Sequence, residues 1–356
     1  MNCNHHRRSH HRKRLFPTSR DVKVKSPRDD RYISNRYKQG SLGASLSDAK
    51  PLLEKPLNNL AYFPGCPNGS SMERISLSKN IAPEGFSGSW NCCKLGCGGW
   101  GCAYMCNRHD EKDELAVFKV PLGFEPMVEQ GSAPTVPERV MRKIEERARI
   151  LEALRHPNLL KLLGISRTAP LLIYEYGDGG SVEWQLNNGW KPNMRDVILL
   201  GIQIGDALRY IHSRGLVHGD VKPGNIFLVG GVAKLGDFST LVKLLAKTSS
   251  HSSQGYTPGY RAPEQVYSDI KLKAVELGIE SRMDVYMLGN LLLYTLTGDT
   301  VDGEDAVRPG VVDEAVEEVS NPELRSLLRL MLEAEPSKRI SSDEVVRRLV
   351  RIYEKL

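Results

Sequence analysis

The sequence has no hydrophobic run long enough to cross a membrane. Its apolar runs, such as residues 171–174 and 291–294, are far shorter than the roughly 18 apolar residues of a transmembrane helix. The amino terminus is basic and rich in histidine with no apolar segment behind it, so it also lacks the layout of a secretory signal peptide. We therefore expect a cytoplasmic protein without a transmembrane segment.

Cysteine is missing from most of the chain. All seven cysteines lie within the first 106 of the 356 residues. None falls in the longer carboxyl-terminal part, which a secreted fold would also stabilise with disulfides. We therefore expect free thiols in a reducing compartment. Five cysteines surround a glycine-rich stretch without the paired C-x-x-C arrangement of a zinc site, so strand packing is favoured over metal binding. They are Cys92, Cys93, Cys97, Cys102 and Cys106.

Positive charge is concentrated at one end of the chain. Residues 1–40 contain twelve Lys and Arg against three Asp, although the whole chain carries a formal charge of only +6. Residues 1–86 are rich in polar side chains and show no sustained apolar period, which predicts a basic, mostly disordered extension. Its basic clusters could contact an acidic partner, nucleic acid or an anionic surface, but a solvated tail is favoured.

The rest of the chain has the pattern of a globular α+β protein. Short apolar runs punctuated by glycine predict strands around one helix with an apolar face, and after residue 180 the pattern becomes mainly helical. The predicted strands are residues 90–95, 102–107, 114–120, 159–165 and 171–176. The predicted long helices are residues 140–154, 194–213, 282–297, 322–334 and 342–354.

The first chemical signal is a glycine-rich turn between two predicted strands. Gly96, Gly98 and Gly101 leave room for backbone amides to approach phosphate groups without a side-chain clash. For this motif alone, a glycine-rich hairpin without a ligand is an equal interpretation. Lys119 ends the third predicted strand eighteen residues after Gly101, where its ammonium group could reach a nucleotide held under the turn.

With this turn and lysine the sequence resembles the eukaryotic-type serine/threonine protein kinases, and the resemblance extends over about residues 90–354. It implies a bilobal protein-kinase-like fold, with a small lobe of antiparallel sheet plus one helix and a larger, mainly helical lobe. The implied division is an extension at 1–86, a small lobe at 87–176 and a large lobe at 177–356.

The strongest motif is His-Gly-Asp-Val-Lys-Pro-Gly-Asn at residues 218–225. Kinases use this spacing to orient a substrate hydroxyl beside an amide that holds Mg²⁺. The resemblance implies that Asp220, Lys222 and Asn225 are catalytic, with Lys222 steadying the transferred phosphate as in serine/threonine kinases. It also implies that Asn225 and Asp237 bind Mg²⁺ or Mn²⁺.

The resemblance further implies ATP as phosphoryl donor and protein substrates as acceptors. Tyr174 takes the gatekeeper place, and the backbone of the next few residues would pair with adenine. The implied ATP-binding residues are Leu95, Gly96, Gly98, Gly101, Ala103, Val117, Lys119, Glu175 and Gly177.

Residues 255–264 end in Ala-Pro-Glu and resemble the close of a kinase activation segment. Thr257 matches the threonine that serine/threonine kinases place beside the catalytic Asp. The resemblance implies that Asp284 anchors the large lobe and that Arg339 pairs with Glu264. We expect autophosphorylation within a preceding run of hydroxyl residues, namely Thr248, Ser249, Ser250, Ser252 or Ser253.

Two residues of the catalytic motifs depart from the family pattern. Gly219 replaces the usual arginine before the catalytic Asp and so removes the cation that grips a phosphorylated activation loop. We therefore expect non-RD regulation, in which loop phosphorylation is no strict switch. Ser239 replaces the glycine that usually follows Asp237 and Phe238.

The helix of the small lobe also departs from the pattern. Arg147, not a glutamate, stands where the partner of Lys119 is expected, and Glu146 lies about 100° round the helix. Either a bulge brings Glu145 or Glu146 inward, or this ion pair is missing. Residues 268–280 are a predicted extra helical segment near the substrate face.

Other functions compete with the kinase interpretation. A pseudokinase that binds partners without catalysis would explain Ser239 and the missing helix glutamate. A small-molecule phosphotransferase would explain Gly219, because aminoglycoside and choline phosphotransferases carry the same His-Gly-Asp stretch, although Lys222 and the Ala-Pro-Glu segment argue against it. Nucleic-acid binding would rest on the tail alone. The retained catalytic residues favour phosphoryl transfer to protein.

Overall fold

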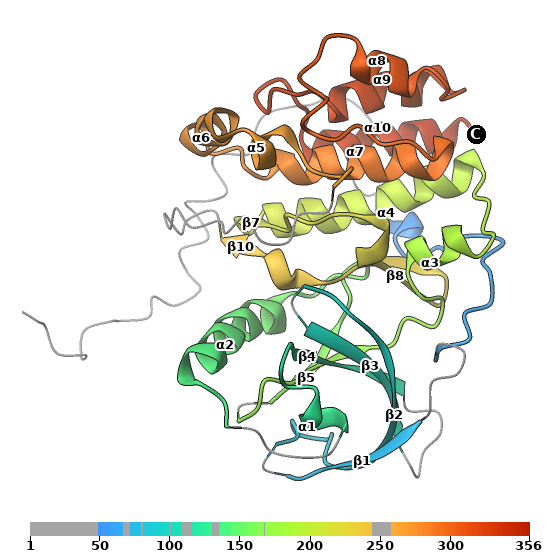
Figure 1. Cartoon of the computed structure of the whole chain (residues 1–356). Coiled ribbons are helices and arrows are strands. Elements are labelled where there is room, and N and C mark those ends of the chain that lie inside the picture. The colour runs from blue at the N-terminus through green and yellow to red at the C-terminus, as the bar shows by residue number, and fades with distance from the viewer. Residues whose placement is uncertain are drawn as a thin grey trace, which may run out of the picture. The chain divides into compact units, whose positions relative to one another are not determined.

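The fold is seen in a computed structural model (Figure 1). It describes residues 49–66, 72–79, 81–99, 101–108, 115–129, 135–166, 168–243 and 258–356. Contacts divide the chain into residues 1–42, which lie outside this description, and residues 43–356. The expectations for the basic tail, for Thr257 and for the hydroxyl run at 248–253 lie outside the described residues.

The small lobe contains a six-stranded antiparallel sheet with strand order β1-β2-β3-β4-β6-β5. Its strands are β1 (Glu73–Leu77), β2 (Gly88–Cys97), β3 (Gly101–Arg108), β4 (Leu115–Pro121), β5 (Leu162–Ile165) and β6 (Leu172–Glu175). All five predicted strands are confirmed. Strand β1 was not predicted from the sequence; it pairs with β2 at the edge of the sheet.

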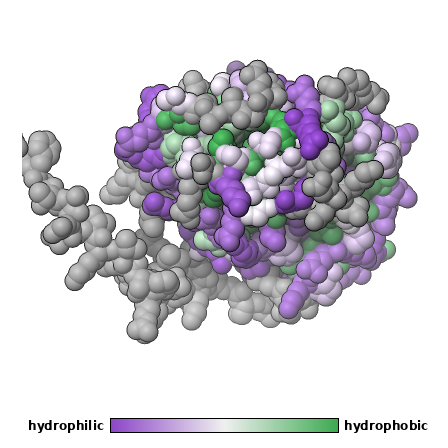
Figure 2. Space-filling view, turned by 90° about the horizontal axis from the view of Figure 1, so that it is seen from below, coloured by the Kyte–Doolittle hydropathy of each residue, from purple (hydrophilic) through white to green (hydrophobic). Residues whose placement is uncertain are grey.

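Alternation along the strands gives this sheet one buried face. In β4, Ala116, Phe118 and Val120 are buried, while the residues between them are more exposed. Trp90 of β2 is fully buried and meets Phe118 edge to face, with ring centroids 5.1 Å apart. The short helix α1 (Pro126–Glu129) adds Met127 to this core. Figure 2 shows the outer end of this lobe, where hydrophobic residues lie near the middle among hydrophilic ones.

Helix α2 (Glu138–Ala153) confirms the helix predicted at 140–154. Ile144, Ala148 and Leu151 recur at three- and four-residue spacing and are all buried, which is the apolar face that the sequence predicted. The helix is unbroken over its sixteen residues and ends where Leu154 becomes extended. In Figure 1 it lies beside the sheet, next to the large lobe.

Helices α4 (Met194–His212) and α7 (Arg282–Thr297) form the centre of the large lobe, and most of their residues are buried. Asn193 and Asp196 form a capping box that begins α4. Helix α10 (Ser342–Glu354) packs against α4, and α9 (Pro322–Met331) against α7. The four long helices predicted for this lobe are therefore confirmed. No helix of the described residues is long and apolar enough to span a membrane.

Shorter elements complete the large lobe. They are α3 (Val182–Asn187), β7 (Leu216–Val217), η3 (Pro223–Asn225), β8 (Ile226–Val229), β9 (Val232–Leu235), η4 (Phe238–Thr240), β10 (Val242–Lys243), α5 (Pro263–Val266), α6 (Ser268–Leu277) and α8 (Val311–Val316). Strand β7 pairs with β10, and β8 pairs with β9. Helix α6 is the helical segment predicted within 268–280. In Figure 1 the short strands lie between α4 and the small lobe.

The expected boundary of the extension at residue 86 is wrong, because residues 49–66, here called the strap, pack on the large lobe. The strap begins with the short 3-10 helix η2 (Lys50–Leu52). The Gln203 side chain of α4 donates to the carbonyls of Leu52 and Lys55 at 3.0 and 2.7 Å. Leu57 of the strap is buried, and its amide donates to the Gly231 carbonyl. These partners are distant in sequence, so no local pattern could predict them.

Candidate functional site

The β2–β3 hairpin forms the glycine-rich turn. The Gly98 amide donates to the Gly101 carbonyl at 2.9 Å and closes the turn. At Gly101 an added Cβ would lie 1.9 Å from the Val120 carbonyl oxygen, so only glycine fits against β4. At Gly98 no described atom lies within 4 Å of the Cβ position, so the space beside this backbone is open to a ligand.

The sheet face below the turn carries the other residues predicted to bind a nucleotide. Ala103 lies opposite Lys119 in the β3–β4 register, and Val117 lies two residues before Lys119, so all three project from one face. They are partly exposed, as is Leu95 next to the register shift of β2, while the residues of the opposite face form the core. The side chains on this face are therefore partly accessible to a ligand.

Lys119 reaches across to the large lobe. Its Nζ lies 2.6 Å from Oδ1 of Asp237, and the two side chains are 17% and 28% exposed. Burial acts to raise the pKa of the Asp237 carboxyl, but the Lys119 ammonium holds this pKa below its usual range. Asp237 has a left-handed backbone, with φ 50°, and accepts from the Ser239 amide. The carboxylate is therefore ionised and aimed at the lysine.

Asp220, Lys222 and Asn225 lie in contact with one another. The Asn225 amide nitrogen donates to the Asp220 carbonyl and to Asp220 Oδ2, both at 2.8 Å, and Lys222 Nζ lies 3.0 Å from the same Oδ2. Asp220 is only 8% exposed. The residues predicted to be catalytic thus form one cluster, in which an amide and an ammonium group orient a carboxylate.

Asp284 of α7 holds the backbone that leads into Asp220. Its fully buried carboxylate accepts from the amides of His218 and Gly219 at 2.8 and 2.7 Å, and it lies 2.8 Å from His212. Burial acts to raise the pKa of Asp284, but these donors hold it below its usual range. The predicted anchoring contact is therefore present as a set of charge-assisted hydrogen bonds.

The residues predicted to hold Mg²⁺ fit a hard cation. The Gly236 amide donates to the Asn225 carbonyl at 2.8 Å, which brings the residue before Asp237 onto the backbone of Asn225. Because the Asn225 amide nitrogen is turned to Asp220, its amide oxygen is the group of that side chain that could bind a metal. An amide oxygen and an ionised carboxylate are ligands of the kind that Mg²⁺ prefers.

Strand β6 leads from Tyr174 to the junction of the lobes. Tyr174 is buried, which raises the pKa of its hydroxyl. The Glu175 carboxylate pairs with Lys234 of β9 at 2.9 Å and so ties the strand to the large lobe. At Gly177 a Cβ would lie 3.2 Å from the Leu228 carbonyl oxygen, so the chain passes close to β8. The backbone predicted to pair with adenine is thus held from both lobes.

Helix α2 presents Arg147 to the site. Arg147 donates to the Ser239 carbonyl at 2.7 Å, and its guanidinium interacts electrostatically with Tyr174 and Asp237. Burial lowers the pKa of this guanidinium. Glu146 is exposed, and the unbroken helix excludes the bulge that would have turned it inward. The unbroken helix thus argues against the bulge, and Arg147 is the residue of this position that contacts Ser239.

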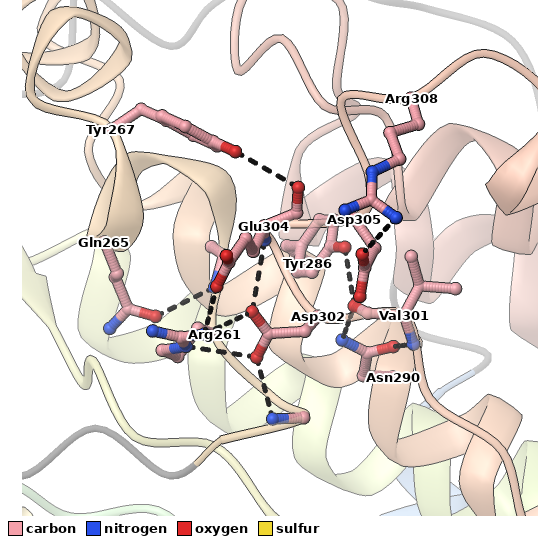
Figure 3. A network of polar contacts seen from close by, with 12 residues as sticks. Arg261, Gln265, Tyr267, Tyr286, Asn290, Val301, Asp302, Glu304, Asp305 and Arg308 are labelled. Carbon is pink, nitrogen blue, oxygen red and sulfur yellow. Dashed lines mark hydrogen bonds and ion pairs between the residues drawn. The ribbon is translucent and has the colours of Figure 1, made fainter.

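The close of the activation segment is fixed by ion pairs that the sequence motifs only partly predicted. Glu264 and Arg339 pair at 2.6 Å, as expected. Arg261 also forms a bidentate ion pair with Asp302. The Asp302 carboxylate accepts a further hydrogen bond from the Gly259 amide at 2.7 Å. Figure 3 shows the contacts of Arg261 with Asp302, which join the segment before α5 to the loop after α7. A sequence signal for Asp302 was absent, because single acidic residues in loops are common.

The expectation of free thiols is wrong for six of the seven cysteines. Disulfides join Cys66 to Cys93, Cys92 to Cys106 and Cys97 to Cys102. The last two pairs lie directly opposite each other in the β2–β3 register, which the sequence spacing alone did not reveal. Disulfides are rare in the cytosol, so the cysteines no longer argue for a cytoplasmic location. Among the described residues no group of three or more His, Cys, Asp or Glu could hold a metal ion.

Comparison with known proteins agrees with this geometry. The family model of the protein kinase domain matches residues 91–349, and the chain belongs to the eukaryotic-type protein kinase family. It is 29% identical over 260 residues to an Aurora kinase of Dictyostelium discoideum, with 71% of this chain and 62% of that protein covered. It is 31% identical over 293 residues to U-box domain-containing protein 70 of Oryza sativa subsp. japonica, with 76% and 33% covered.

A third relative is a calcium/calmodulin-dependent protein kinase type II of Caenorhabditis briggsae, 27% identical over 270 residues, with 69% of this chain and 49% of that protein covered. The chain thus spans between 33% and 62% of the length of these relatives. The matched region is the two-lobed domain that carries the site.

Proposed function

We propose that this protein kinase transfers the γ-phosphate of ATP to serine and threonine hydroxyls of protein substrates. The observation that carries the proposal is the cluster in which Asp220 Oδ2 meets both Asn225 and Lys222. A buried carboxylate held in this way can orient an incoming hydroxyl and accept its proton. The lysine beside it would stabilise the negative charge of the transferred group.

The remaining residues support nucleotide binding. We assign Lys119 and the amides of the glycine-rich turn to the phosphate groups, and Asn225 and Asp237 to a divalent cation. Bound ATP with Mg²⁺ would supply the phosphoryl group and neutralise the charge that develops during transfer. The partly exposed face of Leu95, Ala103 and Val117 would contact the base and sugar.

We also propose that kinase activity is regulated without an arginine before Asp220, because Gly219 occupies that position. Gly219 has φ 79°, a left-handed backbone that an arginine adopts only with strain. The loop in this chain is therefore shaped for glycine, which supports non-RD regulation.

A transfer assay tests the proposal. The purified chain is incubated with γ-labelled ATP, Mg²⁺ or Mn²⁺ and a general protein acceptor, and the labelled residues are identified. We expect label on serine and threonine, and a loss of at least about a hundredfold in Asp220→Asn because the proton acceptor is removed. Equal labelling by Asp220→Asn would refute the role of Asp220. Label found only on a soluble metabolite would refute the choice of acceptor.

A further inference from the structure

The Gln265 side chain of α5 joins two segments of the site. Its amide oxygen accepts from the Ala262 amide at 2.9 Å, and its amide nitrogen donates to the Gly219 carbonyl at 3.0 Å. Figure 3 shows the first of these bonds, with the Gln265 oxygen turned toward the backbone beside Arg261. Both ends of one neutral side chain thus bridge the close of the activation segment and the loop that carries Asp220.

Gly219 is held through both its backbone amide and its backbone carbonyl. Its amide donates to Asp284 Oδ1 at 2.7 Å, and its carbonyl accepts from Gln265. The preceding residue is held in the same way, because the His218 carbonyl accepts from the Thr240 hydroxyl at 2.7 Å. Asp220 follows directly in the chain, so these contacts determine where its carboxylate can lie.

The segment at the other end of Gln265 is itself fixed. Asp302 holds Gly259 and Arg261, because it accepts from the Gly259 amide at 2.7 Å and pairs with Arg261 at 2.8 Å. The residue before Asp302 is tied to α7, because the Val301 carbonyl accepts from the Tyr286 hydroxyl at 2.7 Å. Figure 3 shows these contacts from α7 to Asp302 and Arg261 and the bond from Ala262 to Gln265. The bond from Gln265 to the Gly219 carbonyl then connects this segment to the catalytic loop.

We propose that Gln265 is a positioning residue that holds Gly219, and through it Asp220, without a phosphorylated residue in the activation segment. This inference rests on the proposed phosphoryl transfer. A side-chain amide donates and accepts hydrogen bonds at the same time, whether or not the activation segment is phosphorylated. It thus supplies a permanent link between the activation segment and the catalytic loop at the point where Gly219 offers no cationic side chain.

Two substitutions separate the two bonds of Gln265. Gln265→Glu keeps an acceptor for the Ala262 amide but turns a carboxylate oxygen toward the Gly219 carbonyl. Gln265→Met has a similar size and removes both bonds. We expect kcat to fall about tenfold or more in each, because small misplacement of a catalytic group is costly, while KM for ATP stays within about twofold. Tyr267→Phe is the control, since it loses a bond from the next turn to the Glu304 carbonyl and none to Gly219.

Phosphatase-treated wild-type protein tests the independence from phosphorylation. We expect it to keep its kcat, and a loss that is restored by rephosphorylation would overturn this part of the inference. Wild-type kcat in Gln265→Glu would overturn the positioning role. If Gln265→Met does not fold, Gln265→Glu carries the test, because it retains the bond within α5.

Hydrogen exchange separates this inference from the proposed function. We expect faster amide exchange within residues 216–221 in both Gln265 variants, with unchanged exchange in α4 and α10. Should the wild-type chain transfer no phosphate, the proposed function fails, and the exchange of residues 216–221 still decides whether Gln265 holds the loop. Unchanged exchange there would refute the link.

Discussion

Glu264 and Arg339 form an ion pair whose two side chains are completely buried, with Oε1 2.6 Å from Nη1. The same guanidinium donates to the carbonyls of Glu333 and Arg282. Every N–H donor of the Arg339 guanidinium is thus directed to an acceptor, and α5 is fixed to the loop between α9 and α10. Removal of one partner would leave the other charge buried and uncompensated.

Glu264→Gln should therefore lower the free energy of unfolding by about 3 kcal/mol or more. Chemical denaturation of the two proteins measures this difference. Glu323→Gln is the matched control, because it removes the same charge from the pair with Lys355, in which the side chains are 61% and 51% exposed. An exposed pair contributes about 0–1 kcal/mol. Equal effects of the two substitutions would contradict the buried role.

Arg147→Ala should weaken the binding of ATP with Mg²⁺ by about tenfold, because a charged hydrogen bond to the Ser239 carbonyl is lost beside Asp237. Arg147→Glu should bind more weakly still, since it turns a carboxylate toward that carbonyl. Calorimetric titration measures both affinities. Arg149→Ala, exposed on the same helix, is the control. Wild-type affinity in Arg147→Glu would show that this position needs no cation.

Asp302 should make the free energy of unfolding depend on pH in the acidic range. Burial acts to raise the pKa of its carboxyl, but the bond from Arg261 and those from backbone amides hold it below its usual range. Its contribution is therefore fully present above the unfolded-state pKa of about 3.9 and is lost as pH falls through the lower folded-state pKa. The stability difference between wild type and Asp302→Asn should be constant above about pH 5 and shrink below about pH 4. A constant difference down to pH 2 would argue against the depressed pKa.

Gln203→Leu should release the strap. The substitution leaves the Leu52 and Lys55 carbonyls and the Ala233 amide without the Gln203 side chain, at a cost of about 3 kcal/mol in the free energy of unfolding. Limited proteolysis should then cleave within residues 49–60 well before the wild type is cut. Asn188→Ala, which loses only a local bond to Trp184, should leave the strap protected.

Cysteine accessibility tests the three disulfides. Alkylation of the denatured, unreduced chain should modify at most one of its seven cysteines. Loss of the Cys66–Cys93 bridge, with a separation of 27 residues, should cost about 3 kcal/mol, and loss of Cys97–Cys102, with a separation of 5, should cost less. Seven reactive thiols in protein isolated under non-reducing conditions would contradict the pairing.

Much of the site could be predicted from the sequence, because its residues lie in short motifs with fixed spacing. Asp220, Lys222 and Asn225 fall within six positions, and one turn of chain brings them together. The contact between Lys119 and Asp237 spans 118 positions and was not predicted, because the family resemblance assigned each residue to the nucleotide site only separately. Arg147 illustrates the limit, since the sequence identified the position but not whether the helix turned the arginine inward.

By itself the sequence determined the elements and their order, because the period of buried residues fixes which stretches become strands or helices, as in β4 and α2. It also determined which side chains could do the chemistry. Only the tertiary structure decided the strap, the disulfides and the bridge made by Gln265. The strap contacts and the bond from Gln265 to Gly219 join residues that are remote in the chain, whereas Cys97 and Cys102 are near in the chain and meet because of the register of β2 and β3. All of these contacts follow from how the elements pack and pair. Local patterns carry no record of such pairings.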